Sequence, residues 1–181
     1  MAIEVRTFRV EGISSLLMNN PQGMDGGAPK MGAKKIPTPE EEAAAKVYRL
    51  EDGSLYLPSI SFRSSLLRGC VGKRIGKIGA ASQVAAGVFN AEPETPLIDP
   101  ETGEPITEYR IHKTRCVVQK QGVIRARPEI PRWAADVVFE IDTDFVTVEQ
   151  VRELLGIAGR IAGVGDWRPE KKGPHGRYRV V

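Results

Sequence analysis

Residues 58–68, PSISFRSSLLR, place hydroxyl and guanidinium side chains where a helix is expected to begin. An apolar segment ends at Pro58, small hydroxyl residues including Ser61 can cap a helix there, and Arg63 and Arg68 follow. Backbone amides and the dipole at the start of a helix attract phosphate, and serine and arginine side chains add donors. The segment therefore fits a phosphate site, and it fits an ordinary capped amphipathic helix equally well.

Residues 163–180, GVGDWRPEKKGPHGRYRV, combine glycines with basic and aromatic side chains. Glycines let the chain approach a phosphate backbone, basic groups neutralise it, and aromatic rings stack on bases. The residues that could make such contacts are Trp167, Arg168, Lys171, Lys172 and Arg177. A solvated turn with the tryptophan packed on the core would have a similar composition, but the number of basic groups favours binding.

Other chemistry finds little support in the sequence. No GxSxG, HExxH, Walker or dinucleotide-binding motif occurs. The sequence has only two cysteines, without a CxxC pair, and two histidines, which argues against a zinc site. The two cysteines are expected to be reduced thiols in a cytoplasmic protein. Asp142 and Asp144 share one face of an expected strand, but this spacing suits the end of a strand before a helix better than a metal site. We therefore expect no metal and no cofactor.

The charges are unevenly distributed. The formal net charge is only +3, yet residues 54–91 contain five lysines and arginines and no acid, and residues 110–132 contain seven against the single Glu129. A third basic block occupies the tail from Arg168 onward. If the fold brings these blocks together, they would attract a polyanion with an affinity that falls as salt rises. Three separate solvated faces are the alternative.

The composition indicates a folded protein without a membrane segment. Hydrophobic residues make up 41% and charged residues 27% of the 181 residues, a balance that supports a buried core. No apolar run reaches the roughly 20 residues of a membrane span. Charged residues occupy the place where a signal peptide would be apolar, so a cytoplasmic location is expected.

The expected elements begin with a half-buried strand over residues 3–13, where apolar and polar residues alternate. Residues 19–46 are rich in glycine, proline and lysine and predict a long loop with one helical turn in EEEAAAK. Asp52-Gly53, inside residues 47–57, predicts a hairpin with a type I′ turn. Apolar spacing then predicts a helix over residues 62–77.

The second half begins with a long connection over about 80–105. Residues 106–119 and 123–142 read as two strands joined at the turn KQG, and two prolines make about 110–132 a projecting hairpin, the thumb. A helix is expected over 148–162, ending at a glycine, and RYRVV is the last strand. Without the insertions the order is βαββαβ, which predicts an α+β, ferredoxin-like (RRM-like) fold in one domain, 1–181.

In this order, the motifs resemble those of the RAMP superfamily of CRISPR effector proteins, and within it the backbone (Cas7-like) subunit. Its members carry a proline–serine–basic signature at the first helix, a basic strand with a thumb, and a glycine-rich loop before the last strand. Here the signature is LPSISFRSSLLR and the loop ends in GRYRV, while serines replace two of the usual glycines and the chain is short. The matching positions are Pro58, Ser61, Arg63, Arg68, Gly176 and Arg177.

The resemblance implies a subunit that polymerises as a helical filament along a single-stranded guide RNA and grips its phosphates without sequence specificity, beside other CRISPR effector subunits. At the helix it implies contacts from Ser61, Arg63 and Arg68. On the sheet and thumb it implies contacts from Arg110, Lys113, Arg115, Arg125 and Arg127. The loop would touch the strand or a neighbouring copy through Trp167, Arg168, Lys171 and Lys172, with Arg177 at its exit.

Three alternatives stay open. Asp25 lies in the loop where some type III members carry an aspartate that promotes metal-dependent cleavage of target RNA, although a lone aspartate among glycines is also an ordinary turn residue. A phage or mobile-element protein that binds single-stranded DNA could use the same fold, because RNA and DNA differ at the 2′-hydroxyl. An interaction module without nucleic acid would have its basic blocks on opposite faces.

Overall fold

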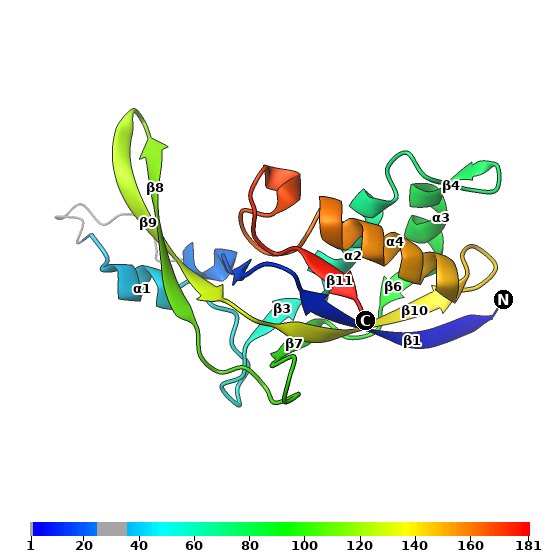
Figure 1. Ribbon diagram of the computed structural model, residues 1–181, viewed down its shortest axis with the longest axis horizontal. Helices are drawn as coiled ribbons and strands as arrows, with labels where there is room; N and C mark the ends of the chain where they lie inside the picture. The colour runs from blue at the N-terminus through cyan, green and yellow to red at the C-terminus, as the bar shows by residue number, and fades with distance from the viewer. Residues whose placement is uncertain (1, 25–35) are drawn as a thin grey trace.

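The computed structural model describes residues 2–24 and 36–181 (Figure 1). Its main sheet is antiparallel, and β10 at its centre pairs with β1 on one side and with both β6 and β7 on the other. The strands are β1 (Ile3–Gly12), β3 (Tyr56–Pro58), β6 (Val88–Asn90), β7 (Glu94–Ile98), β10 (Ala134–Asp142) and β11 (Tyr178–Val180). β11 continues the sheet beyond β1, and β3 continues it beyond β7.

The helices α2 (Ser59–Gly69), α3 (Ala80–Gly87) and α4 (Val148–Ile161) lie on one face of this sheet (Figure 1). The expected helix over 148–162 is confirmed, and its periodic apolar residues, such as Leu155, are buried. It begins with a capping box at Thr147, and Gly163 follows its end with a φ of 66°. α2 crosses α4 at Gly69, where a Cβ would lie 2.7 Å from Cβ of Ala158, so the close crossing requires glycine.

The main sheet is buried on one face and open on the other. Phe8 of β1 and Phe139 of β10 point toward the helices and pack with ring centroids 6.1 Å apart. On the opposite face, Val5 is 57% exposed and Phe89 is 49% exposed. The alternation over residues 3–13 therefore gives a half-buried strand, as expected.

A second sheet carries the projecting hairpin. It consists of β2 (Leu16–Leu17), β9 (Gln121–Ile130) and β8 (Arg110–Val118). We call β8–β9 the thumb, and Figure 1 shows it standing away from the main sheet at the left. Its two-residue turn is Gln119-Lys120, both with positive φ, and not the expected KQG. The segment over 123–142 is interrupted near its prolines, as expected: β9 ends at Ile130, and β10 begins at Ala134 in the main sheet.

Short elements complete the chain. η1 (Pro21–Met24) and α1 (Pro39–Ala44) precede β3, and α1 contacts the thumb. The hairpin of β4 (Arg74–Ile75) and β5 (Ile78–Gly79) lies at the opposite end of the molecule from the thumb (Figure 1). The second 3-10 helix, η2 (Pro169–Lys171), interrupts the glycine-rich loop.

Three further expectations need correction. The helix expected over 62–77 ends at Gly69, because Gly72 and Gly76 adopt φ values of 75° and 60° that lead into the β4–β5 hairpin. The connection expected over 80–105 contains α3, β6 and β7. The turn at Asp52-Gly53 is not type I′, because only Gly53 has a positive φ.

Within the described ranges, no helix is both long and apolar enough to cross a membrane.

Candidate nucleic-acid interface

Residues 163–177 form the glycine-rich loop, which lies between α2 and the thumb. At Gly165, with a φ of 79°, a Cβ would approach the carbonyl oxygen of Leu17 to 2.5 Å. At Gly176, with a φ of 70°, a Cβ would collide with the carbonyl oxygen of Val164. These glycines therefore seat the loop on β2 and on its own beginning, a packing role independent of any ligand.

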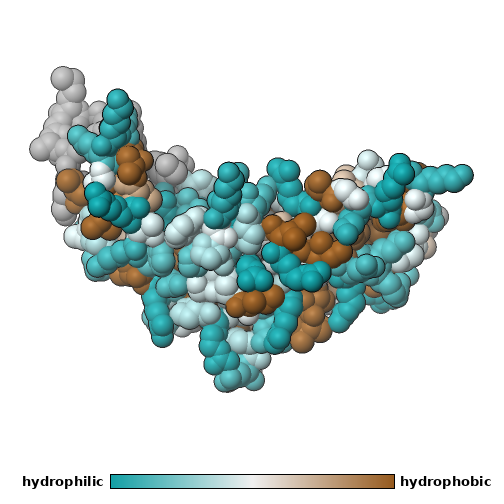
Figure 2. All heavy atoms as spheres, turned by 45° about the horizontal axis from the view of Figure 1, so that its top comes forward, coloured by the Kyte–Doolittle hydropathy of each residue, from teal (hydrophilic) through white to brown (hydrophobic). Residues whose placement is uncertain are grey.

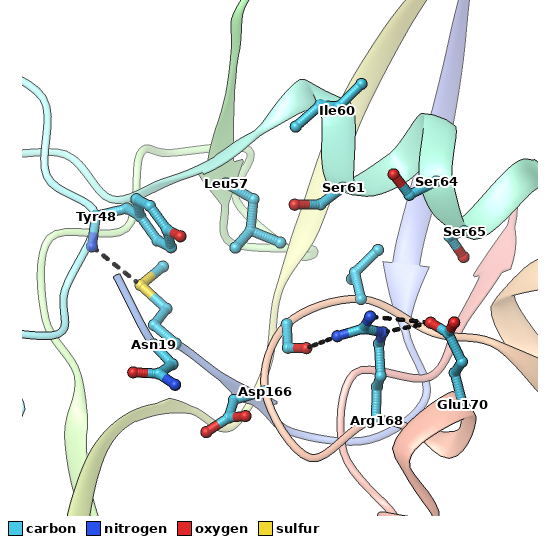
Figure 3. Close-up of a pocket in the computed structure, with 13 residues that line it drawn as sticks. Asn19, Tyr48, Leu57, Ile60, Ser61, Ser64, Ser65, Asp166, Arg168 and Glu170 are labelled. Carbon is cyan, nitrogen blue, oxygen red and sulfur yellow. Dashed lines mark hydrogen bonds and ion pairs between the residues drawn. The ribbon is translucent and has the colours of Figure 1, made fainter. Parts of the chain in front are cut away.

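A first cavity of about 290 Å³ opens between the loop and the first turns of α2 (Figure 3). Ser61 and Arg168, both expected at the site, line it from opposite sides. The full lining is Met18, Asn19, Tyr48, Leu57, Ile60, Ser61, Ser64, Ser65, Val164, Gly165, Asp166, Arg168 and Glu170. We call this space the α2 cavity.

A second cavity of about 380 Å³, the thumb cavity, opens between the loop and the thumb. Its lining is Leu17, His112, Thr114, Arg115, Cys116, Arg125, Arg127, Asp166, Trp167 and Lys171. Asp166 belongs to both cavities, so they lie on the two sides of this residue. Figure 2 shows the thumb rising from the body, with a hollow in the surface beside it and both hydrophilic and hydrophobic residues on the thumb. The start of α2 and the thumb thus lie on two sides of the glycine-rich loop.

Three rings connect the loop to the thumb. The ring centroids of His112 and His175 are 5.1 Å apart, and that of Trp167 lies 5.5 Å from His175 and 6.4 Å from His112. Trp167 has a φ of 46°, a strained value for a residue with a side chain, and stays 41% exposed. Nδ1 of His175 is 2.9 Å from Oγ of Ser15, and burial together with the charge of His112 lowers the pKa of His175. Trp167 thus offers an accessible ring beside the thumb.

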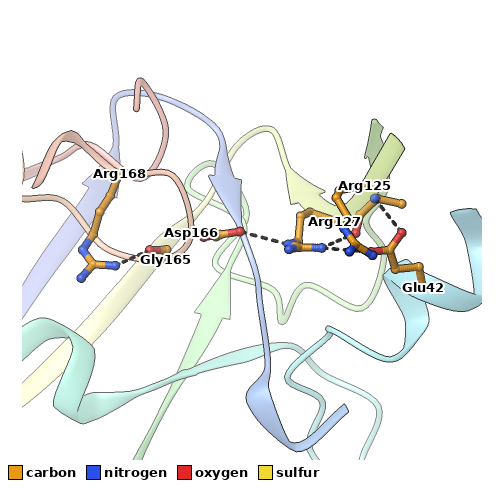
Figure 4. Close-up of polar contacts among 7 residues, drawn as sticks. Glu42, Arg125, Arg127, Gly165, Asp166 and Arg168 are labelled. Carbon is orange, nitrogen blue, oxygen red and sulfur yellow. Dashed lines mark hydrogen bonds and ion pairs between the residues drawn. The ribbon is translucent and has the colours of Figure 1, made fainter. Parts of the chain in front are cut away.

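Carboxylates already engage several of the arginines (Figure 4). Nε of Arg127 is 3.0 Å from Oδ2 of Asp166, and its Nη1 is 3.4 Å from Oε1 of Glu42. Arg125 lies 3.6 Å from the same Glu42 oxygen. These pairs link α1, the thumb and the loop, so part of the expected positive charge is neutralised inside the protein.

Glu170 also forms ion pairs with arginines, on the α2 side of the loop. Its carboxylate is 2.7 Å from Nε of Arg68 and 2.9 Å from Nη2 of Arg168, and Nη1 of Arg168 donates to the carbonyl oxygen of Gly165. Burial alone would raise the pKa of Glu170, but the hydrogen bond from Arg168 and the nearby positive charges lower it below its usual value. The carboxylate therefore stays charged and holds both arginines.

Buried Lys46 adds a cation that the sequence analysis did not single out. Burial lowers its pKa, and the charges of Arg127 and Arg125 lower it further, while Glu42 and Asp166 act in the opposite direction. No ion pair within the described ranges engages its ammonium. Lys46 therefore adds positive potential below the thumb without a carboxylate of its own.

Several expected cations carry no ion pair in the described part of the chain, and they are Arg110, Lys113, Arg115, Lys171, Lys172 and Arg177. Lys171 and Arg115 line the thumb cavity. The side chains of Lys113 and Arg115 start from the thumb face opposite to that of His112, since alternate residues of a strand point to opposite sides. Lys113 therefore lies outside the cavity, and the guanidinium of Arg115 lies over Gly122 on that other face.

Arg63 has a different environment from the one expected. Its Nε donates to the carbonyl oxygen of Val88 at 2.7 Å and its Nη2 to that of Ala85 at 3.0 Å. The guanidinium also lies 5.1 Å from the ring centroid of Phe89. It lines neither cavity, and its contacts join α2 to α3 and β6.

Asp25, the candidate for metal-dependent cleavage, lies outside the described residues. Within residues 2–24 and 36–181, no group of three or more His, Cys, Asp or Glu side chains could hold a metal ion.

Sequence reasoning missed the acids that organise the interface and the small side chains of the α2 cavity. Asp166 had a signal, because it lies between Gly165 and Trp167 in the loop already selected. Glu42 and Asn19 had none: Asn19 begins the segment expected to be a long loop, and Glu42 lies in its one expected helical turn without any sign of a distant partner. Their roles depend on contacts with distant parts of the chain.

No family model and no curated protein matches this chain. Among solved structures, the crystal structure of Cmr6 from Pyrococcus furiosus is similar with a TM-score of 0.50 and 12% sequence identity, over the full length of both chains. At this identity the similarity concerns the fold.

Proposed function

We propose that this chain is a RAMP-type subunit that binds single-stranded RNA along the hollow between its thumb and its glycine-rich loop. The full-length similarity to Cmr6, itself a RAMP-type CRISPR subunit, supports the assignment at the level of the family. When the elements inserted between them are left out, β1, α2, β6, β10, α4 and β11 have the order βαββαβ, which supports a ferredoxin-like core.

The proposal rests mainly on one observation: the start of α2 and the thumb, both basic in sequence, lie on either side of the basic glycine-rich loop. Lys171 and Arg125 line the thumb cavity, Ser61 lines the α2 cavity, and the exposed ring of Trp167 stands beside the thumb. Such an arrangement suits a single strand whose phosphates meet the cations and whose bases reach an aromatic surface. Phosphate contacts position a strand without reading it, so binding is largely independent of sequence.

The proposal extends to assembly. Copies of this chain would follow one another along the guide strand, together with other CRISPR effector subunits, in the cytoplasm. Purified protein would then carry nucleic acid and form helical arrays that electron microscopy detects.

Replacing Lys171 with glutamate tests the interface. We expect Lys171→Glu to weaken binding to any single-stranded RNA several-fold at low salt, because a cation facing the strand becomes an anion. The plot of log association constant against log salt concentration has a negative slope, and this slope should become shallower by about 0.7 or more, the contribution of one phosphate contact to a single strand. Fluorescence anisotropy with labelled oligoribonucleotides over a salt series measures both.

Lys77→Glu is the matched control, because it makes the same charge change in the β4–β5 hairpin, far from the thumb (Figure 1). Equal affinities of the two variants would contradict the proposed interface. Equal binding of RNA and DNA of one sequence would favour the DNA-binding alternative, and no binding of either would leave an interaction module.

A further inference from the structure

A groove of about 560 Å³, the α4 groove, lies between α4 and β11. β11 is the last strand on its side of the main sheet, and α4 lies beside it (Figure 1). The groove shares no residue with the α2 cavity or the thumb cavity, so it is separate from the proposed RNA interface. α4 contributes one face to it, with residues at positions i, i+4, i+7, i+8 and i+11. They are Glu149, Glu153, Gly156, Ile157 and Arg160.

Gly156 has no packing role that the described part of the chain explains. A Cβ at this position would meet nothing within 4 Å, whereas a Cβ at Gly159, in the same helix, would collide with the carbonyl oxygen of Tyr178. Glycine inside a helix lowers the stability of that helix relative to alanine, so an open glycine is unfavourable for this chain alone. Gly156 leaves a notch in the surface of α4 that a side chain of another molecule can fill.

Apolar side chains surround this notch. Ile157 follows Gly156 on the same face of α4, and Ile13 and Val180 belong to the part of the groove that lies outside the helix. Ile13 is 46% exposed, so part of this apolar wall faces the solvent. The groove therefore has an apolar side chain next to a hole, which is the arrangement by which two helices interlock when they pack on each other.

The charges on this face of α4 have no ion pairs inside the chain. Within residues 2–24 and 36–181, no opposite charge engages Glu149, Glu153 or Arg160. Glu149 and Glu153 are one turn apart, so their like charges repel each other. Arg160 lies on the other side of the notch. The face is thus negative before Gly156 and positive after it, and it matches a copy of itself that lies in the opposite direction.

We propose that the α4 groove binds α4 of a second copy of this chain, with the two helices antiparallel about a two-fold axis beside Gly156 and Ile157. Position 156 of one copy then lies opposite position 157 of the other, so each Ile157 fills the notch at the other copy's Gly156. Each Glu153 faces the other copy's Arg160, which also relieves the repulsion between Glu149 and Glu153. A two-fold interface uses the same patch on both copies, as this self-matching face allows.

This pairing is separate from RNA binding. It leaves the thumb and the glycine-rich loop free, because none of their cavity residues belongs to the groove. A two-fold contact closes after two copies, so it produces a dimer and not a filament. Copies that follow one another along a strand would therefore touch through other surfaces.

Analytical ultracentrifugation tests the pairing on protein that nuclease and high salt have freed of nucleic acid and that is then returned to low salt. We expect a monomer–dimer equilibrium in the micromolar range, because one helix face and a strand edge make a small interface. Gly156→Gln places a side chain in the notch and should weaken the dimer about tenfold or more. The thermal midpoint of this variant should equal or exceed that of the unchanged protein, since glutamine favours a helix more than glycine does.

An exchange of charges tests the antiparallel arrangement. Glu153→Arg and Arg160→Glu each place like charges opposite one another across the axis, so each should weaken the dimer, and more strongly at low salt. The double variant Glu153→Arg/Arg160→Glu restores opposite charges at both places and should recover most of the affinity of the unchanged protein. The double variant has the same net charge as the unchanged protein, so it also controls for net charge.

The possible outcomes are distinct. A protein that stays monomeric up to about 100 µM would overturn the pairing. Unchanged association of folded Gly156→Gln would overturn it as well, because the notch would then have no contact. A double variant that associates no better than the single ones would overturn the antiparallel pairing. A dimer that binds no single-stranded RNA in anisotropy titrations would overturn the proposed function and leave the pairing intact.

Discussion

The helix-covered face of the main sheet and the interface around the glycine-rich loop hold together by different means. In the first, large side chains such as Phe139 and Leu155 are fully buried between strands and helices. In the second, arginine–carboxylate pairs such as Arg127–Asp166 and Arg68–Glu170 connect segments that have little apolar surface in common. Burial of a large side chain stabilises a protein by several kcal/mol, whereas partly exposed ion pairs contribute about 1 kcal/mol or less.

This difference separates stability from function in the molecule. The buried layer sets the positions of β1, β10, α4 and β11, and the last two carry the two ends of the loop. The ion pairs keep arginines oriented at the surface, and an arginine held weakly by a carboxylate can turn to a phosphate at little cost. Changes in the buried layer should therefore affect folding, and changes around the loop should affect the proposed RNA binding.

Phe139→Ala should have the largest effect on stability. The side chain is fully buried against Phe8, so its removal leaves a cavity and should lower the free energy of unfolding by about 3–5 kcal/mol. Urea unfolding followed by circular dichroism measures the loss. Val5→Ala, on the open face of the same sheet, is the control and should cost much less. If the folded fraction of Phe139→Ala bound RNA much more weakly than the unchanged protein, the separation between the two regions would be wrong.

Glu170→Gln should change binding more than stability. The substitution removes the charge that pairs with Arg68 and Arg168, and the loss of these partly exposed pairs should cost about 1 kcal/mol or less. The two arginines then face the solvent with their full charge, so affinity for single-stranded RNA should rise at low salt and the rise should shrink as salt increases. Anisotropy titrations at two salt concentrations measure both effects.

Glu51→Gln makes the same change of net charge at a turn outside both cavities and serves as the control. A similar rise in affinity for this variant would show that net charge matters more than the release of the two arginines.

The sequence predicts the elements of the buried layer well where its periodicity is long. Residues 148–162 repeat their apolar side chains over four turns, and Val137 to Ile141 alternate strictly, so both elements could be recognised. β6 has only three residues and α3 consists mostly of small ones, so neither gives a periodic signal. They become strand and helix because β10 and α2 provide surfaces for them, which local sequence does not reveal.

The interface could be predicted as a set of segments but not as a set of contacts. Basic and glycine-rich stretches marked α2, the thumb and the loop, and the structure brings them together. The environment of Arg63, by contrast, depends on Val88 and Phe89, which lay in a segment expected to be a loop. Likewise, the pairing of Arg127 with Glu42 joins residues 85 positions apart. Charge patterns locate cations, and only the fold decides which of them already have partners.

The smallest expected effect concerns pH and the ring cluster between loop and thumb. Burial and the charge of His112 lower the pKa of His175, while Glu129 and Asp166 act weakly against them. The ordinary value of 6.5 applies to the unfolded chain, so the unfolded chain takes up a proton first as the pH falls. His175 therefore costs no stability above pH 6.5, and the folded state loses stability progressively below it.

His175→Gln tests this sign, because glutamine stays neutral and can still bond to Ser15. The thermal midpoint of the unchanged protein should fall further than that of His175→Gln when the pH is lowered from 7 to 5.5. The two proteins should keep a constant difference above pH 7, where the histidine is neutral in both the folded and the unfolded chain. Parallel profiles of the thermal midpoint against pH would mean that protonation of His175 does not lower the stability of the folded protein. The thumb would then be held to the loop chiefly by the Arg127 ion pairs.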